Sequence, residues 1–175
     1  ISVDTSKAEV MIAAVEAGAG LINDVRALRG FGSLETASEL GVPICLMHMQ
    51  GEPVSMQDNP RYQDVVVEVR DFLIRRTTVC EEAGISLTQL LIDPGFGFGK
   101  SFEHNRRLMA ELDVFAALGP LLAVGLSRKG FVAALLGDLE CDGDIGSAGL
   151  AMLAAQKGAQ VVRVHDVAIT RDLIR

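Results

Sequence analysis

The sequence has no tryptophan, one tyrosine and seven phenylalanines among its 175 residues, so aromatic side chains make up only 5% of it. Such a composition does not favour a surface that stacks nucleic-acid bases. A surplus of positive charge is also absent, because 16 Lys and Arg stand against 23 Asp and Glu, and the formal net charge is −7. Nucleic-acid binders normally carry a basic patch or stripe, so we expect no nucleic-acid partner.

Long hydrophobic runs and paired cysteines are missing as well. The longest apolar run, Val114–Leu126, has 13 residues and is interrupted by glycine and proline, whereas a membrane-spanning helix needs about 20. We therefore expect no membrane partner. The three cysteines, Cys45, Cys80 and Cys141, are odd in number and form no C-x-x-C motif. This argues against a disulfide framework and a zinc site, and it favours a reducing, cytoplasmic compartment.

The sequence does contain the material for a core, with 49% hydrophobic residues, 22% charged residues and 18 glycines. This composition excludes a disordered chain, and the length suits a single domain. Short apolar runs alternate with helical stretches, and their continuous apolar character is typical of parallel strands buried on both faces. The predicted strands are Ile1–Asp4, Gly20–Asp24, Pro43–His48, Gln89–Asp93, Leu121–Leu126 and Gln160–His165.

Amphipathic helices are predicted between these strands. The clearest follows Pro60, where apolar residues from Tyr62 to Ala83 recur every three to four positions. The first helix is predicted to begin after a cap at Thr5 or Ser6, and the polar segment 50–59 is predicted to be a long loop. Glycines that follow predicted helices are expected to adopt the left-handed conformation that other residues resist. They are Gly18, Gly41, Gly84, Gly119 and Gly158.

Strand–helix alternation indicates an α/β fold with right-handed crossovers. Six units in 175 residues give about 29 residues per unit, which is close to the ~31 of an eight-unit TIM (β/α)8 barrel. A doubly wound open sheet has the same local pattern. The periodicity alone therefore leaves these two folds open.

Polar residues stand where the apolar runs stop. In both folds the functional site lies at the carboxyl ends of the strands. A single polar residue at such an end is most often a helix cap, but polar groups at six successive ends favour a site. The residues are Asp4, Asn23, Asp24, His48, Asp93, Ser127, Arg128, Lys129, Arg163, His165 and Asp166.

Several of these side chains also have an ordinary structural interpretation. We expect Asn23 to point into the site while Asp24 caps or turns the chain. His48 stands between two methionines, and such a histidine is more often packed and hydrogen-bonded than a ligand. Met47 is expected to form an apolar wall.

The stretch 93–100, Asp-Pro-Gly-Phe-Gly-Phe-Gly-Lys, is the most unusual part of the sequence. Its glycines at alternate positions permit close backbone approach, and their spacing does not match a phosphate-binding P-loop. Phe96 and Phe98 are expected to be exposed on this loop, which indicates a flat apolar substrate. The cationic runs 127–129 and 163–165 point to an anionic ligand such as phosphate, although a solvated rim paired with nearby acids is the alternative.

Six motifs, in order along the chain, resemble the bacterial dihydropteroate synthase family. They are Ile1–Lys7, Ile22–Asp24, Leu46–Gly51, Asp93–Lys100, Ser127–Lys129 and Arg163–Val167. The family is a TIM barrel, and the resemblance implies that residues 1–175 form a single pterin-binding barrel domain. It also implies that this domain carries the third to eighth strands, lacks the first two, and is cut short in its last helix. We accordingly expect the 175-residue chain to be inactive on its own.

The resemblance implies a transferase of folate biosynthesis that condenses 6-hydroxymethyl-7,8-dihydropterin diphosphate with 4-aminobenzoate, in a pocket that sulfonamides also occupy. Asp4 and Lys129 would be catalytic, and Asp4 would stabilise positive charge that develops on the pterin. Phe98 and Lys129 would form the aminobenzoate pocket, in which Gly130 stands where many relatives have serine. The pterin would be bound by Asp4, Asn23, Met47, Asp93 and Lys129, and the diphosphate by Arg163, Val164 and His165.

Mg²⁺ is the implied cofactor, with its expected asparagine ligand outside this chain, and a homodimer is the implied assembly. Two other functions stay open. A methyltetrahydrofolate methyltransferase also reads pterin with Asp and Asn but binds no diphosphate, so Arg163 and His165 argue against it. A non-catalytic binding or scaffold domain has no reason to keep costly polar groups together at the strand ends.

Overall fold

The computed structural model describes residues 1–137 and 143–175, so Cys141 lies outside the described part. All six predicted strands are present, each shorter than predicted by one to three residues. They form one parallel sheet in sequence order. The strands are β1 (Ser2–Asp4), β2 (Leu21–Asp24), β3 (Ile44–Met47), β4 (Leu90–Asp93), β5 (Leu121–Gly125) and β6 (Val161–Arg163).

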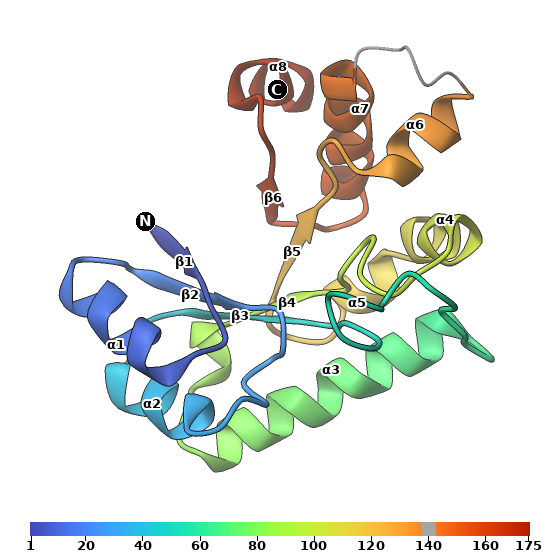
Figure 1. Cartoon of the computed structure of the whole chain (residues 1–175). Helices are drawn as coiled ribbons and strands as arrows, with labels where there is room; N and C mark the ends of the chain where they lie inside the picture. Colours follow the sequence, from blue (N-terminus) through green and yellow to red (C-terminus); the bar gives the residue numbers. More distant parts are fainter. Residues whose placement is uncertain (138–142) are drawn as a thin grey trace.

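Helices connect successive strands and lie on the outer side of a strongly curved sheet (Figure 1). The helices are α1 (Ala8–Glu16), α2 (Ser33–Leu40), α3 (Val65–Glu82), α4 (Phe102–Ala110), α5 (Asp113–Ala116), α6 (Gly130–Leu136), α7 (Gly143–Gln156) and α8 (Val167–Ile174), and a short 3-10 helix, η1 (Leu87–Gln89), precedes β4. A doubly wound sheet reverses its strand order at a switch point, whereas a barrel does not. The sequential order therefore confirms the barrel type of fold.

The loop predictions at the helix ends are confirmed. All five glycines predicted to follow helices have φ between 65° and 106°, which is the left-handed region. The segment 50–59 contains no helix or strand. Among residues 1–137 and 143–175, no helix is both long enough and apolar enough to cross a lipid bilayer.

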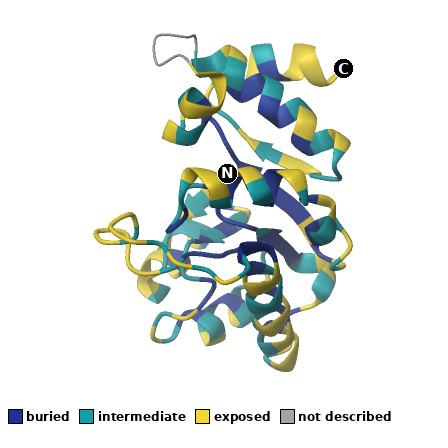
Figure 2. Ribbon diagram, turned by 90° about the vertical axis from the view of Figure 1, so that its right-hand side faces the viewer, coloured by how far each residue is buried: buried dark blue, intermediate teal, exposed yellow. Residues whose placement is uncertain are grey.

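Burial follows the position of each strand in the sheet. Every residue of β3 is buried, and so are four of the five residues of β5. In β1 and β6, by contrast, an exposed residue stands on either side of a half-buried one. Figure 2 shows the buried residues concentrated in the inner strands. The prediction of burial on both faces is wrong for β1 and β6, because each has a paired strand on one side only among the described residues.

Two hydrophobic clusters join the sheet to its helices through the even-numbered strand residues. Ile22, Ile44 and Leu90 pack with residues of α1, α2 and α3 in one cluster. Ile92 and Leu122 pack with residues of α3, α4 and α5 in the other. Because successive side chains of a strand alternate between faces, the odd-numbered residues from β2 to β6 face the opposite, concave side.

The start of α1 differs from the prediction. Lys7 holds the N-cap position, and its side chain makes no capping hydrogen bond. The Ser6 hydroxyl instead donates to the buried carboxylate of Asp24, while the Thr5 hydroxyl accepts from the Lys7 N–H at 3.2 Å. The predicted cap at Thr5 or Ser6 is wrong, because the carboxylate at the end of β2 attracts the serine.

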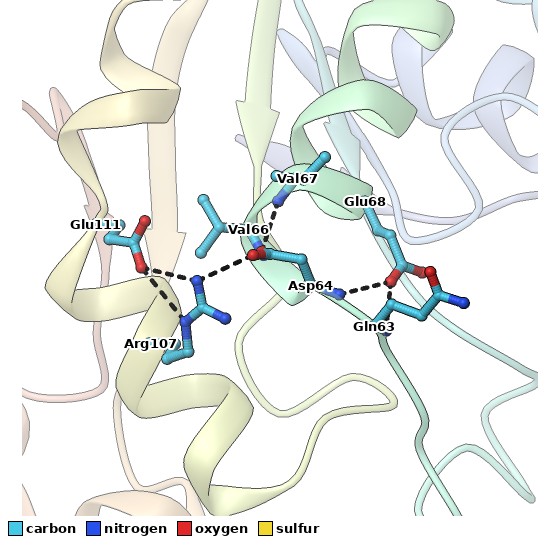
Figure 3. Close-up of polar contacts among 7 residues, drawn as sticks. All are labelled: Gln63, Asp64, Val66, Val67, Glu68, Arg107 and Glu111. Carbon is cyan, nitrogen blue, oxygen red and sulfur yellow. Dashed lines mark hydrogen bonds and ion pairs between the residues drawn. The ribbon is translucent and has the colours of Figure 1, made fainter.

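The start of α3 is fixed by charged contacts with α4 (Figure 3). The helix begins at Val65 rather than near Tyr62, and the Asp64 carboxylate caps it by accepting two N–H groups of the first turn. Arg107 of α4 donates to Asp64 at 3.2 Å and to Glu111 at 3.1 Å. These contacts hold α3 beside α4, which directly follows the glycine-rich loop at residues 94–101.

Candidate active site

A cavity of about 340 Å³ lies on the concave side of the sheet. Each of the six strands contributes alternate residues to its wall, because those side chains point to the same face. Apolar residues and the Cys45 thiol, whose pKa burial raises, form the floor. The alternating strand residues that line the cavity are Ser2, Asp4, Leu21, Asn23, Cys45, Met47, Leu91, Asp93, Ala123, Gly125, Val161 and Arg163.

The parallel register brings the predicted pterin residues together at the carboxyl ends of the strands. Asp4 lies opposite Asn23, and Met47 lies opposite Asp93. Lys129, just after β5, lines the same cavity. All five residues assigned to the pterin by the sequence therefore surround one space.

The Asp93 carboxylate is oriented by the loop that follows it. One of its oxygens accepts the Gly95 N–H at 2.7 Å. Burial raises the pKa of Asp93, while the Lys129 ammonium and the Gly95 N–H act in the opposite direction. The half-buried carboxylate faces the cavity, where it can accept charge-assisted hydrogen bonds from a ligand that offers N–H donors.

Lys129 lies between this cavity and the aromatic loop. Its ammonium donates to the Phe96 carbonyl and sits 4.7 Å from the centre of the Phe98 ring, a cation–π contact. Burial lowers the pKa of Lys129 to about 8, and Asp93 partly opposes that shift. Lys129 can therefore change its charge near neutral pH.

The two polar residues at the end of β2 divide their tasks as predicted. Asn23 lines the cavity. Asp24 is fully buried on the other face and accepts the backbone N–H groups of Arg26 at 2.8 Å and Leu28 at 2.9 Å. Its carboxylate thus shapes the turn after β2 and does not face the cavity.

The glycine-rich loop requires its glycines. A Cβ atom on Gly95 would overlap the carbonyl oxygen of His48, and one on Gly99 would overlap the carbonyl oxygen of Gln50. Both residues also have φ values in the left-handed region, 72° and 64°. The predicted close backbone approach is confirmed.

The two phenylalanines of this loop have different surroundings. Phe96 has no exposed surface, belongs to the main core and stacks on Phe131 with ring centres 5.9 Å apart. Phe98 is half-buried and faces the cavity. The expectation of an exposed pair is wrong for Phe96, because a residue from α6 covers it.

A second cavity, of about 500 Å³, lies beyond Phe98 and Lys129, which line both spaces. Its wall includes Gly130, and a Cβ atom there would meet no other atom within 4 Å. The two residues assigned to the aminobenzoate pocket thus stand at the boundary between the two cavities. Their shared position suits a reaction that joins two ligands.

The residues assigned to the diphosphate lie around the rim. Arg163 lines the first cavity and is mostly exposed. The ring of His165 lies outside the cavity wall, with Nδ1 2.9 Å from the Ser127 hydroxyl. Val164 is half-buried and also outside that wall, so its role stays a prediction. Arg128 forms a two-point ion pair with Asp144 at 2.8 and 2.7 Å. For this residue of the cationic run 127–129, the structure therefore shows the alternative interpretation, a solvated cation paired with a nearby acid.

Comparison with known proteins decides the family. A family described as "Pterin binding enzyme" matches residues 1–165. The chain belongs to the pterin-binding enzyme family. Over all 175 of its residues it is 50% identical to the dihydropteroate synthase of Haemophilus influenzae, and the match covers 64% of that protein. The identity to the Escherichia coli dihydropteroate synthase is 47%, and the match covers 62% of that protein. The chain therefore spans a little under two thirds of the curated relatives it matches.

Solved structures give the same family and support the barrel. The Yersinia pestis dihydropteroate synthase in complex with a sulfonamide drug has a TM-score of 0.94 and 46% identity, and the match covers 99% of this chain and 63% of that one. The Xanthomonas albilineans enzyme in complex with 7,8-dihydropteroate has a TM-score of 0.90 and 49% identity, with 99% and 63% coverage. At these sequence identities the two proteins share a family with this chain and not only a fold.

One buried residue beside the site was not predicted from the sequence. Lys100 is only 3% exposed, and its Nζ lies 2.9 Å from Nδ1 of His48. His48 itself is buried and hydrogen-bonded, as predicted. Burial, and then the Lys100 charge, lowers the pKa of His48 to about 2. The one available signal was a lysine placed directly after the last glycine of the loop.

Metal ligands are not gathered in the described part of the chain. Among residues 1–137 and 143–175, no three or more His, Cys, Asp or Glu side chains are placed to hold a metal ion together. The described residues therefore offer no preformed cluster of three such side chains to a metal ion.

Proposed function

We propose that the protein carrying this chain is a dihydropteroate synthase. It would join 6-hydroxymethyl-7,8-dihydropterin diphosphate to 4-aminobenzoate and release diphosphate. The observation that carries the proposal is the pair of adjoining cavities, which share Phe98 and Lys129 as their common wall. Relatives of this family at 43–50% identity bear the same enzyme name.

The chemistry of the first cavity supports a pterin ligand. The aminopyrimidine edge of a pterin presents N–H donors beside a carbonyl group. The Asp93 carboxylate can accept two such donors, and the Asn23 amide can both donate and accept. The Lys129 ammonium can donate to the pterin carbonyl, and Met47 provides an apolar contact for the flat ring. Together these groups match the whole polar edge.

The reaction itself forms one bond and breaks another. The amine nitrogen of 4-aminobenzoate attacks the methylene carbon of the pterin. The bond between that carbon and the diphosphate oxygen breaks, and both electrons leave with the diphosphate, while the nitrogen loses a proton to water. Positive charge that develops on the pterin is stabilised by the Asp4 carboxylate. Arg163, 3.7 Å from Asp4, would pair with the departing diphosphate.

Mg²⁺, homodimer assembly and cytoplasmic location belong to the proposal as well. Magnesium rests on the family resemblance, and no residue of this chain is assigned to it. The dimer is supported by exposed apolar side chains on the last three helices. The buried, unpaired Cys45 and Cys80 support a reducing compartment. The exposed apolar side chains that support the dimer are Leu135, Leu136, Ile145, Leu153, Val167 and Leu173.

A direct assay tests this function. The complete protein, as it is encoded, is incubated with both substrates and Mg²⁺, and dihydropteroate and diphosphate are measured together. Equal amounts of the two products support the proposal. A folded protein that binds pterin but forms neither product would overturn it, and methyl transfer from methyltetrahydrofolate to a corrinoid would identify the alternative enzyme.

A further inference from the structure

The ammonium of Lys100 is the centre of a buried hydrogen-bond cluster beside the site. Lys100 follows the last glycine of the loop and is almost without exposed surface. Its Nζ donates to the carbonyl oxygens of Gly95 at 2.9 Å and Phe98 at 3.0 Å. It also lies 2.9 Å from Nδ1 of His48 and 3.4 Å from the His48 carbonyl oxygen. These acceptors engage all three N–H groups of the ammonium.

The two loop carbonyls that Lys100 holds belong to Gly95, which contacts the Asp93 carboxylate, and to Phe98, whose ring lines both cavities. The N–H of Gly95 holds the Asp93 carboxylate at 2.7 Å, and the Gly95 carbonyl that Lys100 holds is on the other side of the same α-carbon, so Lys100 restrains the residue that orients the acid. Phe98 carries the ring shared by both cavities. Between them, the Phe96 carbonyl accepts from Lys129. Three carbonyls of one short loop are therefore held by two lysines.

The other end of the cluster is firmly fixed. The His48 N–H donates to the Asp93 carbonyl at 3.0 Å, which continues the pairing of β3 and β4. Its ring meets Phe72 of α3 edge-on, with centres 4.9 Å apart. In the neutral ring with its proton on Nε2, Nδ1 can accept a hydrogen bond from the Lys100 ammonium. Lys100 thus ties the glycine-rich loop to the end of β3.

We propose that Lys100 is a positioning residue that sets the Asp93 carboxylate and the Phe98 ring together, and so couples the two substrate subsites. Lys100 lines the second cavity, but its ammonium is engaged by loop carbonyls and by His48, so it acts on the substrates through the loop. The proposal rests on the proposed function for the identity of the second subsite. The first subsite can be tested with a pterin alone.

The test uses Lys100→Met in the complete protein, since methionine nearly matches the side-chain volume and donates no hydrogen bond. The Kd for 6-hydroxymethylpterin is measured by calorimetry and the KM for 4-aminobenzoate by turnover. We expect both to rise roughly tenfold, because two buried carbonyls lose their donor. Lys100→Gln, which keeps two N–H donors, replaces this variant if methionine prevents folding, and a smaller rise in the same direction is expected.

A matched control separates positioning from general stability. Arg76 also donates to two loop carbonyls, those of Ala27 at 2.8 Å and Leu28 at 3.2 Å, but it faces the outer side of the sheet. Arg76→Met is expected to lower Tm and to leave both ligand constants within twofold. If Lys100→Met behaves in the same way, the proposal is wrong.

A double-mutant cycle measures the coupling between Lys100 and Phe98 in the KM for 4-aminobenzoate. A lysine with a purely structural role would show no such coupling. Once Phe98 is changed to alanine, the loop has no ring left to position. Lys100→Met is therefore expected to raise the KM for 4-aminobenzoate by much less in the Phe98→Ala background than in the wild type. Fully additive effects would contradict the coupling. If the complete protein shows no turnover at all, the pterin Kd still decides the role of Lys100 at the first subsite.

Discussion

The guanidinium of Arg163 lies 3.7 Å from the carboxylate of Asp4, although these residues belong to β6 and β1, the two outermost strands of the sheet. Curvature of the sheet therefore brings the two ends of the strand order to one rim. A ligand at that rim meets a cation and an anion side by side. This arrangement suits a leaving group that is negative and a remaining fragment that becomes positive.

Replacing Arg163 by alanine tests the cationic half of this pair. The variant is expected to bind the pterin diphosphate roughly tenfold or more weakly, because it loses charge-assisted bonds to phosphate oxygens. Binding of 6-hydroxymethylpterin, which has no phosphate, should change little. Calorimetry with both ligands measures the difference, and Arg163→Lys should fall between the two proteins. Equal losses for the two ligands would mean that Arg163 has no specific phosphate contact.

Asp93→Asn tests the recognition of the pterin edge. The substitution keeps the shape of the side chain but turns one acceptor into an N–H donor that faces the donors of the ligand. Affinity for 6-hydroxymethylpterin should fall roughly a hundredfold. Asp24→Asn is the control, since that buried carboxylate at the end of β2 faces away from the cavity. Asp24→Asn should lower the stability of the protein and leave its affinity for 6-hydroxymethylpterin unchanged. If Asp24→Asn instead weakened pterin binding and Asp93→Asn lowered only stability, the roles assigned to the two carboxylates would be wrong.

The two phenylalanines of the loop should give opposite results. Phe96→Ala opens a hole in the core and should lower the free energy of unfolding by about 3–5 kcal/mol. Phe98→Ala removes a half-buried ring at the cavity boundary, so it should change Tm little and raise the KM for 4-aminobenzoate. Chemical denaturation and steady-state kinetics on both variants check this. A large loss of stability in Phe98→Ala alone would contradict the assignment.

Lys129 should make stability depend on pH in the alkaline range. Its pKa is about 8 in the folded protein and about 10.4 in an unfolded chain. Between these values the unfolded state binds more protons, so the contribution of Lys129 to stability increases as the pH rises from about 8 to 10. Lys129→Met should therefore show a smaller increase over this range in denaturant titrations. An identical slope in both proteins would show that the ammonium is not buried.

The strand ends and the glycines could be predicted from the sequence because their signals are local. The change from apolar to polar residues marks the end of each strand, and glycine marks each left-handed turn. Phe96, Ser6 and Lys100 could not be assigned in this way. The first is buried by Phe131, the second is drawn to Asp24, and the third is enclosed by His48, and all three partners are distant in sequence.

Gly95 and Gly99 lie very close to the backbone of the loop that follows β3, at His48 and Gln50. This close approach restricts which substitutions the protein can tolerate there. No side chain can be added at either position without displacing a carbonyl group, so substitutions there are expected to be lost by selection against misfolding. Gly130, which faces open space in the second cavity, carries no such restriction. Heritable change in what the second cavity accepts is therefore more accessible at the start of α6 than in the loop that forms its opposite wall.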